Sequence, residues 1–242
     1  MELIEEILKE RPFFHSSETE ISRGFNPGES FLPHQEAERC ASQDVASACY
    51  GISRDVAYFI SDLIGPSSHT LETGAGISTL IFAIKGATHT VVTPSESEIV
   101  AIRGYAKTKN IDLGNIQFVM KPSDQFLPSA NIKNLDMVFL DGKHAFPWPV
   151  IDWFYSADRL KQGGIMIVDD AHMKSVRILV DFMRVDPGWS LLKSFGNKNF
   201  SFRKERDSIH DVAWHMQPYN INYLDKPNKF AGFIRRLISK AT

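Results

Sequence analysis

Acidic side chains stand directly after two apolar runs of the sequence, where strands would end. Asp141 follows Met137-Val138-Phe139-Leu140, and Asp169 and Asp170 follow Ile165-Met166-Ile167-Val168. Short runs that are apolar at every position are typical of strands buried on both faces of a parallel sheet. Because ligands bind outside the carboxyl ends of such strands, we expect these carboxylates to gather at one binding edge.

The carboxylates of this edge need a positive partner, because clustered negative charges repel one another. Adjacent strands lie about 4.8 Å apart, so side chains from both can share one cation. We therefore expect Asp141, Asp169 and Asp170 to bind a hard divalent ion, Mg²⁺. The alternative is that Asp141 contacts an ammonium group of a cofactor, while Asp170 caps the next helix.

Basic side chains lie beside the same carboxylates. Lys143 and His144 follow Asp141, and His172 follows Asp170. Imidazole has the pKa range of a general base that takes a proton from a hydroxyl group. A neighbouring carboxylate raises the pKa of a histidine, which weakens it as a base near neutral pH. We rank His144 and Lys143 together as candidate bases, ahead of His172, with hydrogen bonds to loop carbonyls as the alternative role of the histidines.

A glycine turn, Glu72-Thr73-Gly74-Ala75-Gly76, precedes a helical pattern that starts near Ser78. Glycines let the backbone turn tightly and let a ligand approach the main chain, and the helix beyond offers unpaired amide groups. A dinucleotide site has a third small residue three positions after the second glycine, where this chain has Thr79. Glu72 would also repel a pyrophosphate. The turn therefore favours S-adenosylmethionine, which has a sulfonium group and no phosphate, over NAD.

Apolar runs of strand length alternate with helical patterns from about residue 53, which predicts a doubly wound, mostly parallel α/β sheet. The runs cover residues 69–73, 88–93, 116–120, 137–141 and 164–169. The end of the alternation differs, because residues 189–202 have the pattern of a β-hairpin that turns at Gly196-Asn197. We therefore expect a seven-stranded, Rossmann-like sheet closed by an antiparallel hairpin, which is not the usual ending of a nicotinamide-binding domain.

Three segments are expected along the chain: an N-terminal arm at 1–45, the binding domain at 46–204, and a C-terminal extension at 205–242. The arm begins with a short amphipathic helix and is rich in phenylalanine, so we expect it to fold back onto the domain. It would do so either as plain packing or as a cap over the mouth of the site. Lys229–Lys240 has one apolar and one basic face, which favours docking on the domain or packing in a homo-oligomer over membrane binding.

Composition narrows the classes of partner. The 242 residues have a formal net charge of −2, without the basic field that nucleic-acid binding needs. No apolar stretch approaches the roughly 18 residues that span a bilayer, and the acidic N-terminus does not resemble a signal peptide. Two cysteines, Cys40 and Cys49, are too few for a disulfide framework. We expect a cytoplasmic protein with a small-molecule substrate.

Three motifs resemble those of a known family. Residues 71–79 resemble the first motif of class I S-adenosylmethionine-dependent methyltransferases, and residues 140–144 and 160–172 resemble the fourth- and fifth-strand motifs of the methyltransferase-24 group. Catechol O-methyltransferase and antibiotic-tailoring O-methyltransferases are related enzymes. The resemblance covers about residues 53–203. It implies the fold, the cofactor and methyl transfer, and it leaves the acceptor open.

The resemblance also implies roles by position. The turn would line the methionine half of the cofactor through Glu72, Gly74, Gly76, Ser78 and Thr79. After the second strand the family has an acid that holds both ribose hydroxyls, and this chain has Thr93 there. Either Glu96 reaches in, or the hydroxyls of Thr93 and Ser95 make weaker bonds. Ser123 and Asp124 match the region that meets the adenine edge, with a plain helix cap as the alternative.

These observations favour methylation of an oxygen on a small hydroxylated molecule, such as a sugar, a phenol or a polyketide, with Mg²⁺ assistance. The absence of a ribose acid at Thr93 motivates an alternative, a cofactor-binding or catalytically dead interaction protein. An NAD-dependent oxidoreductase on the same topology is less favoured, because Thr79 and the closing hairpin are unusual for one.

Overall fold

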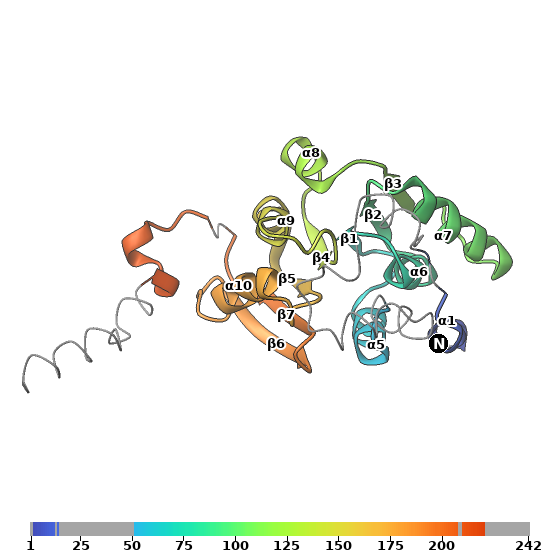
Figure 1. Cartoon of the computed structure of the whole chain (residues 1–242), viewed down its shortest axis with the longest axis horizontal. Helices are drawn as coiled ribbons and strands as arrows, with labels where there is room; N and C mark the ends of the chain where they lie inside the picture. The colour runs from blue at the N-terminus through green and yellow to red at the C-terminus, as the bar shows by residue number, and fades with distance from the viewer. Residues whose placement is uncertain (1, 13, 15–50, 208–209, 221–242) are drawn as a thin grey trace, which may run out of the picture.

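A seven-stranded sheet forms the centre of the molecule, with helices on both of its faces (Figure 1). The computed structural model describes residues 2–12, 14, 51–207 and 210–220. Within them the strands are β1 (His69–Thr73), β2 (Thr88–Val92), β3 (Ile116–Val119), β4 (Leu135–Leu140), β5 (Leu160–Val168), β6 (Trp189–Phe195) and β7 (Asn199–Lys204). Their order in the sheet is β3-β2-β1-β4-β5-β7-β6.

The first five strands are parallel, and β7 pairs antiparallel with both β5 and β6. The predicted doubly wound sheet with a closing hairpin is therefore confirmed. Strand β1 lies in the middle, with β2 on one side and β4 on the other, so the carboxyl ends of these three strands meet at one edge. That edge is where a ligand binds in a sheet of this kind.

The helices cover the sheet in two layers. They are α1 (Glu2–Glu10), α5 (Arg54–Leu63), α6 (Ile77–Ile84), α7 (Glu96–Thr108), α8 (Ser123–Phe126), α9 (Trp148–Ala157) and α10 (Lys174–Met183), with short 3-10 turns at Leu127–Ser129 and Trp214–Met216. Helices α1, α5, α6 and α7 contribute to the hydrophobic core on one face, and α9 and α10 to the core on the other. Ser53 caps α5, because its side chain accepts a hydrogen bond from the Val56 amide at 3.3 Å.

Alternation along β1 sends neighbouring side chains to opposite cores. Leu71 belongs to the core that contains α9 and α10, whereas Glu72 contacts residues of α6 on the other face. A carboxylate is thus buried under the first turn of a helix, where it needs polar partners to offset the loss of solvation. The hydroxyls of Ser78 and Thr79, at the start of α6, are these partners.

The beginning of the predicted arm packs on the domain. Ile4, Ile7 and Leu8 of α1 are buried in the same core as α5 and α6. On the solvent side, Lys109 at the end of α7 pairs with Glu6 and Glu10 of α1. The proposed cap over the site, the two cysteines and the basic helix at 229–240 lie outside the described residues.

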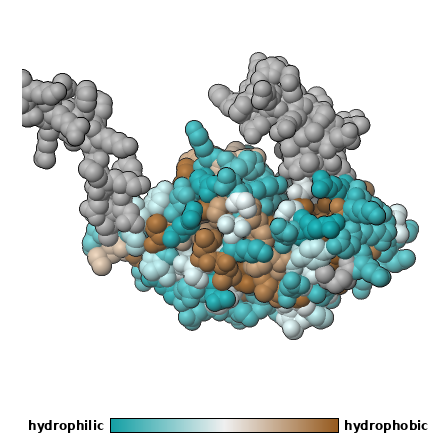
Figure 2. Space-filling model, turned by 90° about the horizontal axis from the view of Figure 1, so that it is seen from below, coloured by the Kyte–Doolittle hydropathy of each residue, from teal (hydrophilic) through white to brown (hydrophobic). Residues whose placement is uncertain are grey.

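The surface mixes polar and apolar groups. On the face drawn in Figure 2, hydrophobic side chains gather between hydrophilic ones. Single large apolar side chains are exposed at several positions, among them Phe146, Phe154, Ile178, Trp214 and Met216. Exposure of this kind is ordinary for a folded domain. No helix in the described part of the chain is long and apolar enough to cross a membrane.

Packing of α1 gives a first test. Ile7 has 0% of its surface exposed, so Ile7→Ala should lower the free energy of unfolding by about 2–5 kcal/mol through the cavity it leaves. Leu63→Ala is the matched control, because Leu63 is 46% exposed, and we expect it to cost less than about 1 kcal/mol. Urea unfolding of both variants measures the difference. Equal losses would contradict the docking of α1.

Candidate active site

The glycine turn joins β1 to α6 at the carboxyl edge of the sheet. Gly74 has a φ of 87°, and a Cβ at this position would lie 2.1 Å from the backbone oxygen of Asp141. Only glycine combines this left-handed backbone with such a close approach. A Cβ on Gly76 would meet nothing within 4 Å. The main chain at the start of α6 therefore faces open space, where a ligand can approach it.

Beneath the turn, the Glu72 carboxylate is almost completely buried, with 1% of the residue exposed. It accepts hydrogen bonds from the hydroxyls of Ser78, at 2.6 Å, and Thr79. The Thr79 hydroxyl in turn accepts a bond from the Gly76 amide at 3.2 Å. The structure thus brings together all five residues that the sequence assigned to the turn, and their hydroxyl and carboxylate groups brace its shape.

A histidine that sequence reasoning passed over completes this support. His89 of β2 lies with Nε2 3.2 Å from Glu72, and its Nδ1 shares a hydrogen bond with the Thr70 hydroxyl at 2.7 Å. Its ring stacks on Phe82 with centroids 4.0 Å apart. The signal that could have found it is the register of β1 and β2, which places Thr70 opposite His89.

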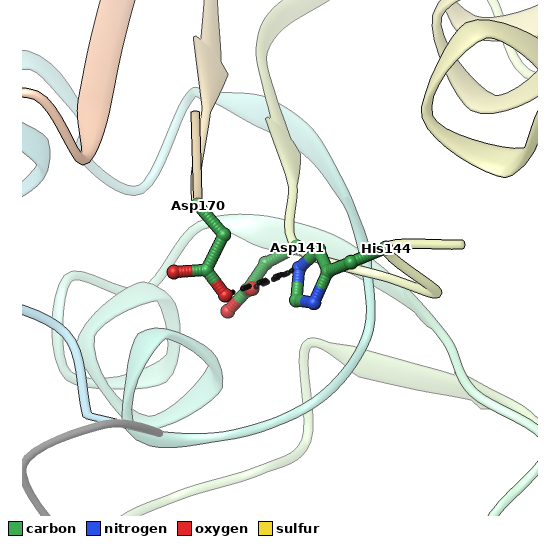
Figure 3. A group of neighbouring side chains, drawn as sticks. All are labelled: Asp141, His144 and Asp170. Carbon is green, nitrogen blue, oxygen red and sulfur yellow. Dashed lines mark ion pairs between the residues drawn. The ribbon is translucent and has the colours of Figure 1, made fainter. Parts of the chain in front are cut away.

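On the other side of the turn, two carboxylates and an imidazole converge (Figure 3). Nε2 of His144 lies 3.3 Å from Asp141 and 3.4 Å from Asp170. One ligand atom from each of the three residues lies within 4.8 Å of the others. The pairing of Leu140 with Val168 explains the meeting, because Asp141 and Asp170 follow these residues at the ends of β4 and β5. We call this set, Asp141, His144 and Asp170, the acid–imidazole group.

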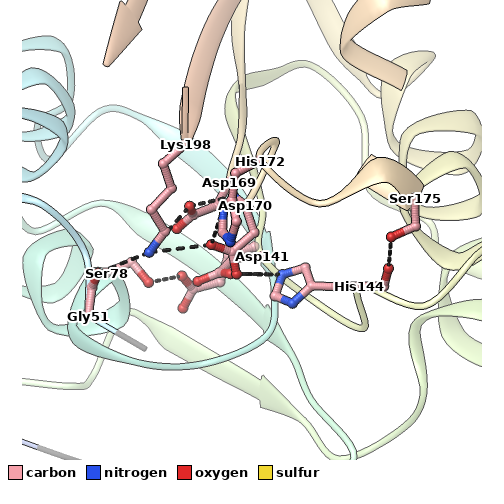
Figure 4. A network of polar contacts seen from close by, with 10 residues as sticks. Gly51, Ser78, Asp141, His144, Asp169, Asp170, His172, Ser175 and Lys198 are labelled. Carbon is pink, nitrogen blue, oxygen red and sulfur yellow. Dashed lines mark hydrogen bonds and ion pairs between the residues drawn. The ribbon is translucent and has the colours of Figure 1, made fainter. Parts of the chain in front are cut away.

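Asp169 turns away from this group. Asp170 adopts a left-handed backbone with a φ of 55°, and its amide donates a 2.6 Å hydrogen bond to the Asp169 carboxylate. Asp169 then faces Lys198, whose Nζ lies 3.8 Å from it and 3.4 Å from Asp170 (Figure 4). The three predicted metal-binding aspartates therefore lie at one edge, and two of them belong to the acid–imidazole group.

Lys198 is the second residue that sequence reasoning missed. In the antiparallel pairing of β5 with β7, Val168 lies opposite Phe200. Just beyond this pairing the Ala171 amide donates to the Lys198 carbonyl at 2.7 Å, which brings Lys198 beside Asp170. The Lys198 ammonium also donates to the Gly51 carbonyl at 3.4 Å. A lysine at the start of the returning hairpin strand was the available signal, but only the register shows which residue it meets.

Charges at this edge perturb one another. Burial raises the pKa of Asp169 well above its ordinary value, and the neighbouring charge of Asp141 adds to this effect. Burial alone would lower the pKa of His144, but the carboxylates of Asp141, Asp170 and Asp169 outweigh it and raise the pKa to about 9. Without another cation present, His144 is therefore an imidazolium at neutral pH and cannot accept a proton.

The other two predicted bases have different surroundings. Lys143 is exposed, and its ammonium lies 3.6 Å from the centroid of the Trp148 ring. His172 lies with Nδ1 3.6 Å from Asp170, and 47% of its side chain is exposed. The loop that carries His144 is fixed to α10, because the Ser175 hydroxyl donates to the His144 carbonyl (Figure 4). Of the three, His144 is the one enclosed by carboxylates.

At the end of β2, the buried Thr93 donates a 2.8 Å hydrogen bond to Glu98 in the first turn of α7. The Ser95 amide donates to the same Thr93 hydroxyl at 3.2 Å, whereas Glu96 is exposed. Sequence reasoning considered Glu96 and missed Glu98. The available signal was the capping pattern, in which a glutamate three residues after a capping serine reaches back over the start of its helix.

Another buried acid lies near the predicted adenine region. Asp152 of α9 is 1% exposed, and its Oδ2 would lie 2.9 Å from a Cβ on Gly142. Burial raises the pKa of Asp152 to about 6, although the hydroxyls of Ser123 and Thr73 beside it oppose the shift. Ser123, predicted at the adenine edge, is thus buried against this acid. A single acid within an otherwise apolar helix was the signal that sequence reasoning left unused.

Residues 71–171 match the family Methyltransf_24, which is described as a methyltransferase domain. The resemblance to this group is therefore confirmed over that stretch, and the sheet has the Rossmann-like strand order that the resemblance implies. The match favours the methyltransferase interpretation over an NAD-dependent oxidoreductase. No curated protein matches the sequence.

Solved structures share the fold at low identity. A protein from Corynebacterium glutamicum is 14% identical with a TM-score of 0.56, and the alignment covers 80% of this chain and 100% of that protein. Cofactor-bound Rv0187 from MTB is 16% identical with a TM-score of 0.57, again covering 80% and 100%. A protein from Staphylococcus aureus, assigned as a caffeoyl-CoA O-methyltransferase, is 18% identical with a TM-score of 0.56, covering 71% and 94%.

Asp152 gives a test in pH. Its carboxyl keeps a proton up to about pH 6 in the folded protein but loses it near the ordinary value of 3.8 when unfolded. Folding therefore takes up a proton between these values, and stability falls as the pH rises through this window. Asp152→Asn stays uncharged, so between pH 5 and 7 the wild type should lose on the order of 1 kcal/mol more stability than this variant.

Urea unfolding at both pH values measures this difference. Asp181→Asn, at an exposed position of α10, is the control and should keep the wild-type pH dependence. An unchanged pH dependence in Asp152→Asn would show that the Asp152 carboxyl titrates at its ordinary value in the folded protein.

Proposed function

We propose that the chain is an S-adenosylmethionine-dependent methyltransferase that methylates an oxygen of a small hydroxylated molecule. One observation carries the proposal: the Gly74 backbone lies directly against the backbone of Asp141. This contact joins the glycine turn to the acid–imidazole group. A methyl donor on the turn and an acceptor at the group would be neighbours. The methyltransferase domain match and the likeness to O-methyltransferase folds support this assignment.

The turn offers what this cofactor needs. Bound S-adenosylmethionine supplies an electrophilic methyl group on a sulfonium. The open main chain at Gly76 and the amide groups at the start of α6 can hold the carboxylate of its methionine part. Glu72 keeps the turn in shape from below and adds negative charge on the side where the cofactor is positive. Alignment of donor and acceptor is then the main task of the protein.

The acid–imidazole group has the chemistry of a divalent metal site. Nε2 of His144 faces the carboxylates of Asp141 and Asp170 at 3.3 and 3.4 Å, and ligand atoms from the three residues converge. Carboxylates suit Mg²⁺ and Mn²⁺, whereas imidazole also suits Zn²⁺ and Fe²⁺. We propose that Asp141, His144 and Asp170 hold the metal, and that Lys198 offsets the remaining charge of Asp169 and Asp170. A metal there would lower the pKa of an acceptor hydroxyl.

The same geometry divides the roles of the histidines. Nε2 of His144 faces both carboxylates, where it is placed to be a metal ligand, so it does not also serve as the base. His172 is half-exposed beside Asp170 and stays available to take the proton of an acceptor hydroxyl when His144 holds a metal. We therefore propose that His172 is the base, and that His144 holds the metal.

Binding and turnover test the proposal. Calorimetry with S-adenosylhomocysteine should show a 1:1 complex, and labelled S-adenosylmethionine should transfer its methyl group to a member of a panel of phenols, sugars and polyketides. No binding of S-adenosylhomocysteine would contradict the cofactor. Binding without transfer to any acceptor class would favour the alternative, a cofactor-binding interaction protein.

A separate measurement tests the metal. Titration with Mn²⁺ by calorimetry should give a site that Asp170→Asn weakens by about tenfold or more, because a buried ligand charge is lost. Asp181→Asn is the control, at an exposed aspartate of α10, and should leave Mn²⁺ affinity unchanged. Full turnover in excess chelator would overturn the metal part and leave the methyl transfer standing.

A further inference from the structure

The end of β2 borders the glycine turn. The Gly74 amide donates to the Val92 carbonyl at 2.9 Å, and Thr93 is the next residue along the chain. The Thr93 amide donates to Val119 of β3, so its backbone is fixed at the carboxyl edge of the sheet. In α/β sheets that bind nucleosides, an acid about 20 residues after the glycine turn accepts the ribose hydroxyl here. Thr93 itself has no carboxylate.

Glu98 brings a carboxylate to this place from the helix. It lies at the third position of α7, and its Oε2 accepts a 2.8 Å hydrogen bond from the Thr93 hydroxyl. In an ordinary capping box the glutamate would bond the amide of the capping residue. Here the Ser95 amide donates its hydrogen bond to the Thr93 hydroxyl instead, at 3.2 Å. Thr93 thereby directs Glu98 toward the strand end rather than toward the helix cap.

We propose that Glu98 binds the ribose hydroxyls of the cofactor and that Thr93 positions its carboxylate. The inference rests on the proposed function, because it assumes a cofactor with an adenosine ribose. The two oxygens of a carboxylate can each accept a hydrogen bond from one of two vicinal hydroxyls. Glu98 lies in the first turn of α7, at the positive end of the helix dipole.

Glu96 does not fit this role equally well. It is the first residue of α7 and is exposed, whereas Glu98 is half-buried and bonded to the strand end. Both are glutamates in the first turn of the same helix, so they feel the same helix dipole. They are therefore a matched pair for an experiment that separates contact with the ribose from general charge.

The experiment combines variants with altered ligands. Calorimetry compares S-adenosylhomocysteine with its 2′-deoxy and 3′-deoxy analogues on the full-length wild type, Glu98→Gln and Glu96→Gln. The wild type should prefer the natural ligand by about tenfold or more over each analogue. Glu98→Gln should weaken the natural ligand by about 10- to 100-fold and reduce this preference to less than about threefold. Glu96→Gln should stay within about twofold of the wild type.

Thr93 is tested in the same assay. Thr93→Val removes the hydroxyl that holds Glu98 and should reduce the ribose preference, while Thr93→Ser should restore it. Thermal unfolding confirms that each variant is folded. A purely structural role for Thr93 would lower stability without changing the ratio between natural and deoxy ligands.

The outcomes separate the two proposals. If the wild type binds S-adenosylhomocysteine and Glu98→Gln keeps the full ribose preference, the role of Glu98 is overturned and the proposed function stands. If Glu96→Gln loses the ribose preference instead, the ribose contact belongs to Glu96, and the proposed role of Glu98 is equally overturned. If the wild type binds no S-adenosylhomocysteine, the proposed function fails and this inference fails with it.

Discussion

The contact between Gly74 and the carbonyl of Asp141 fixes the geometry on which the rest of the site depends. Strand β1 lies between β2 and β4, and its turn is bonded on both sides: Gly74 donates to Val92, and the Asp141 amide donates to Thr73 at 3.1 Å. Any side chain at Gly74 would collide with the end of β4. Backbone pairing, rather than side-chain packing, therefore sets the separation of the two halves of the site. One half is the strand end at Thr93, and the other is the acid–imidazole group.

Charge then decides what each half can do. The acidic edge holds three aspartates and compensates them with His144 and Lys198 from two different loops. A buried carboxylate without compensation is costly, and paired charges are tolerated only when their geometry is good. Lys198 lies 3.8 Å from Asp169 and 3.4 Å from Asp170, whereas His144 faces Asp141 and the other oxygen of Asp170. The hairpin that closes the sheet thus contributes directly to the electrostatics of the site.

The strands and the glycine turn could be predicted from the sequence because their cause is local. Buried parallel strands are apolar at every position, and β1 begins and ends at the predicted residues. Strand β5 begins earlier than expected, at Leu160, because Leu160 pairs with Leu135 before the register shifts. His89, Lys198 and Glu98 could not be assigned in the same way. Their partners are set by strand register or by the direction of a helical side chain, and neither is written in the spacing of residues along the chain.

Helical positions can replace strand-end positions in this architecture, for a geometric reason. In a βα unit the first turn of the helix lies beside the end of its strand, so a long side chain in that turn reaches the same point as a short one on the strand. Glu98 does this after β2, and Asp152 reaches Gly142, just beyond β4, from within α9. A threonine at the strand end then becomes the anchor for an acid in the helix rather than its substitute. In our proposal, the acid that is missing at Thr93 is supplied by Glu98 from the helix, so a carboxylate still lies at the end of β2.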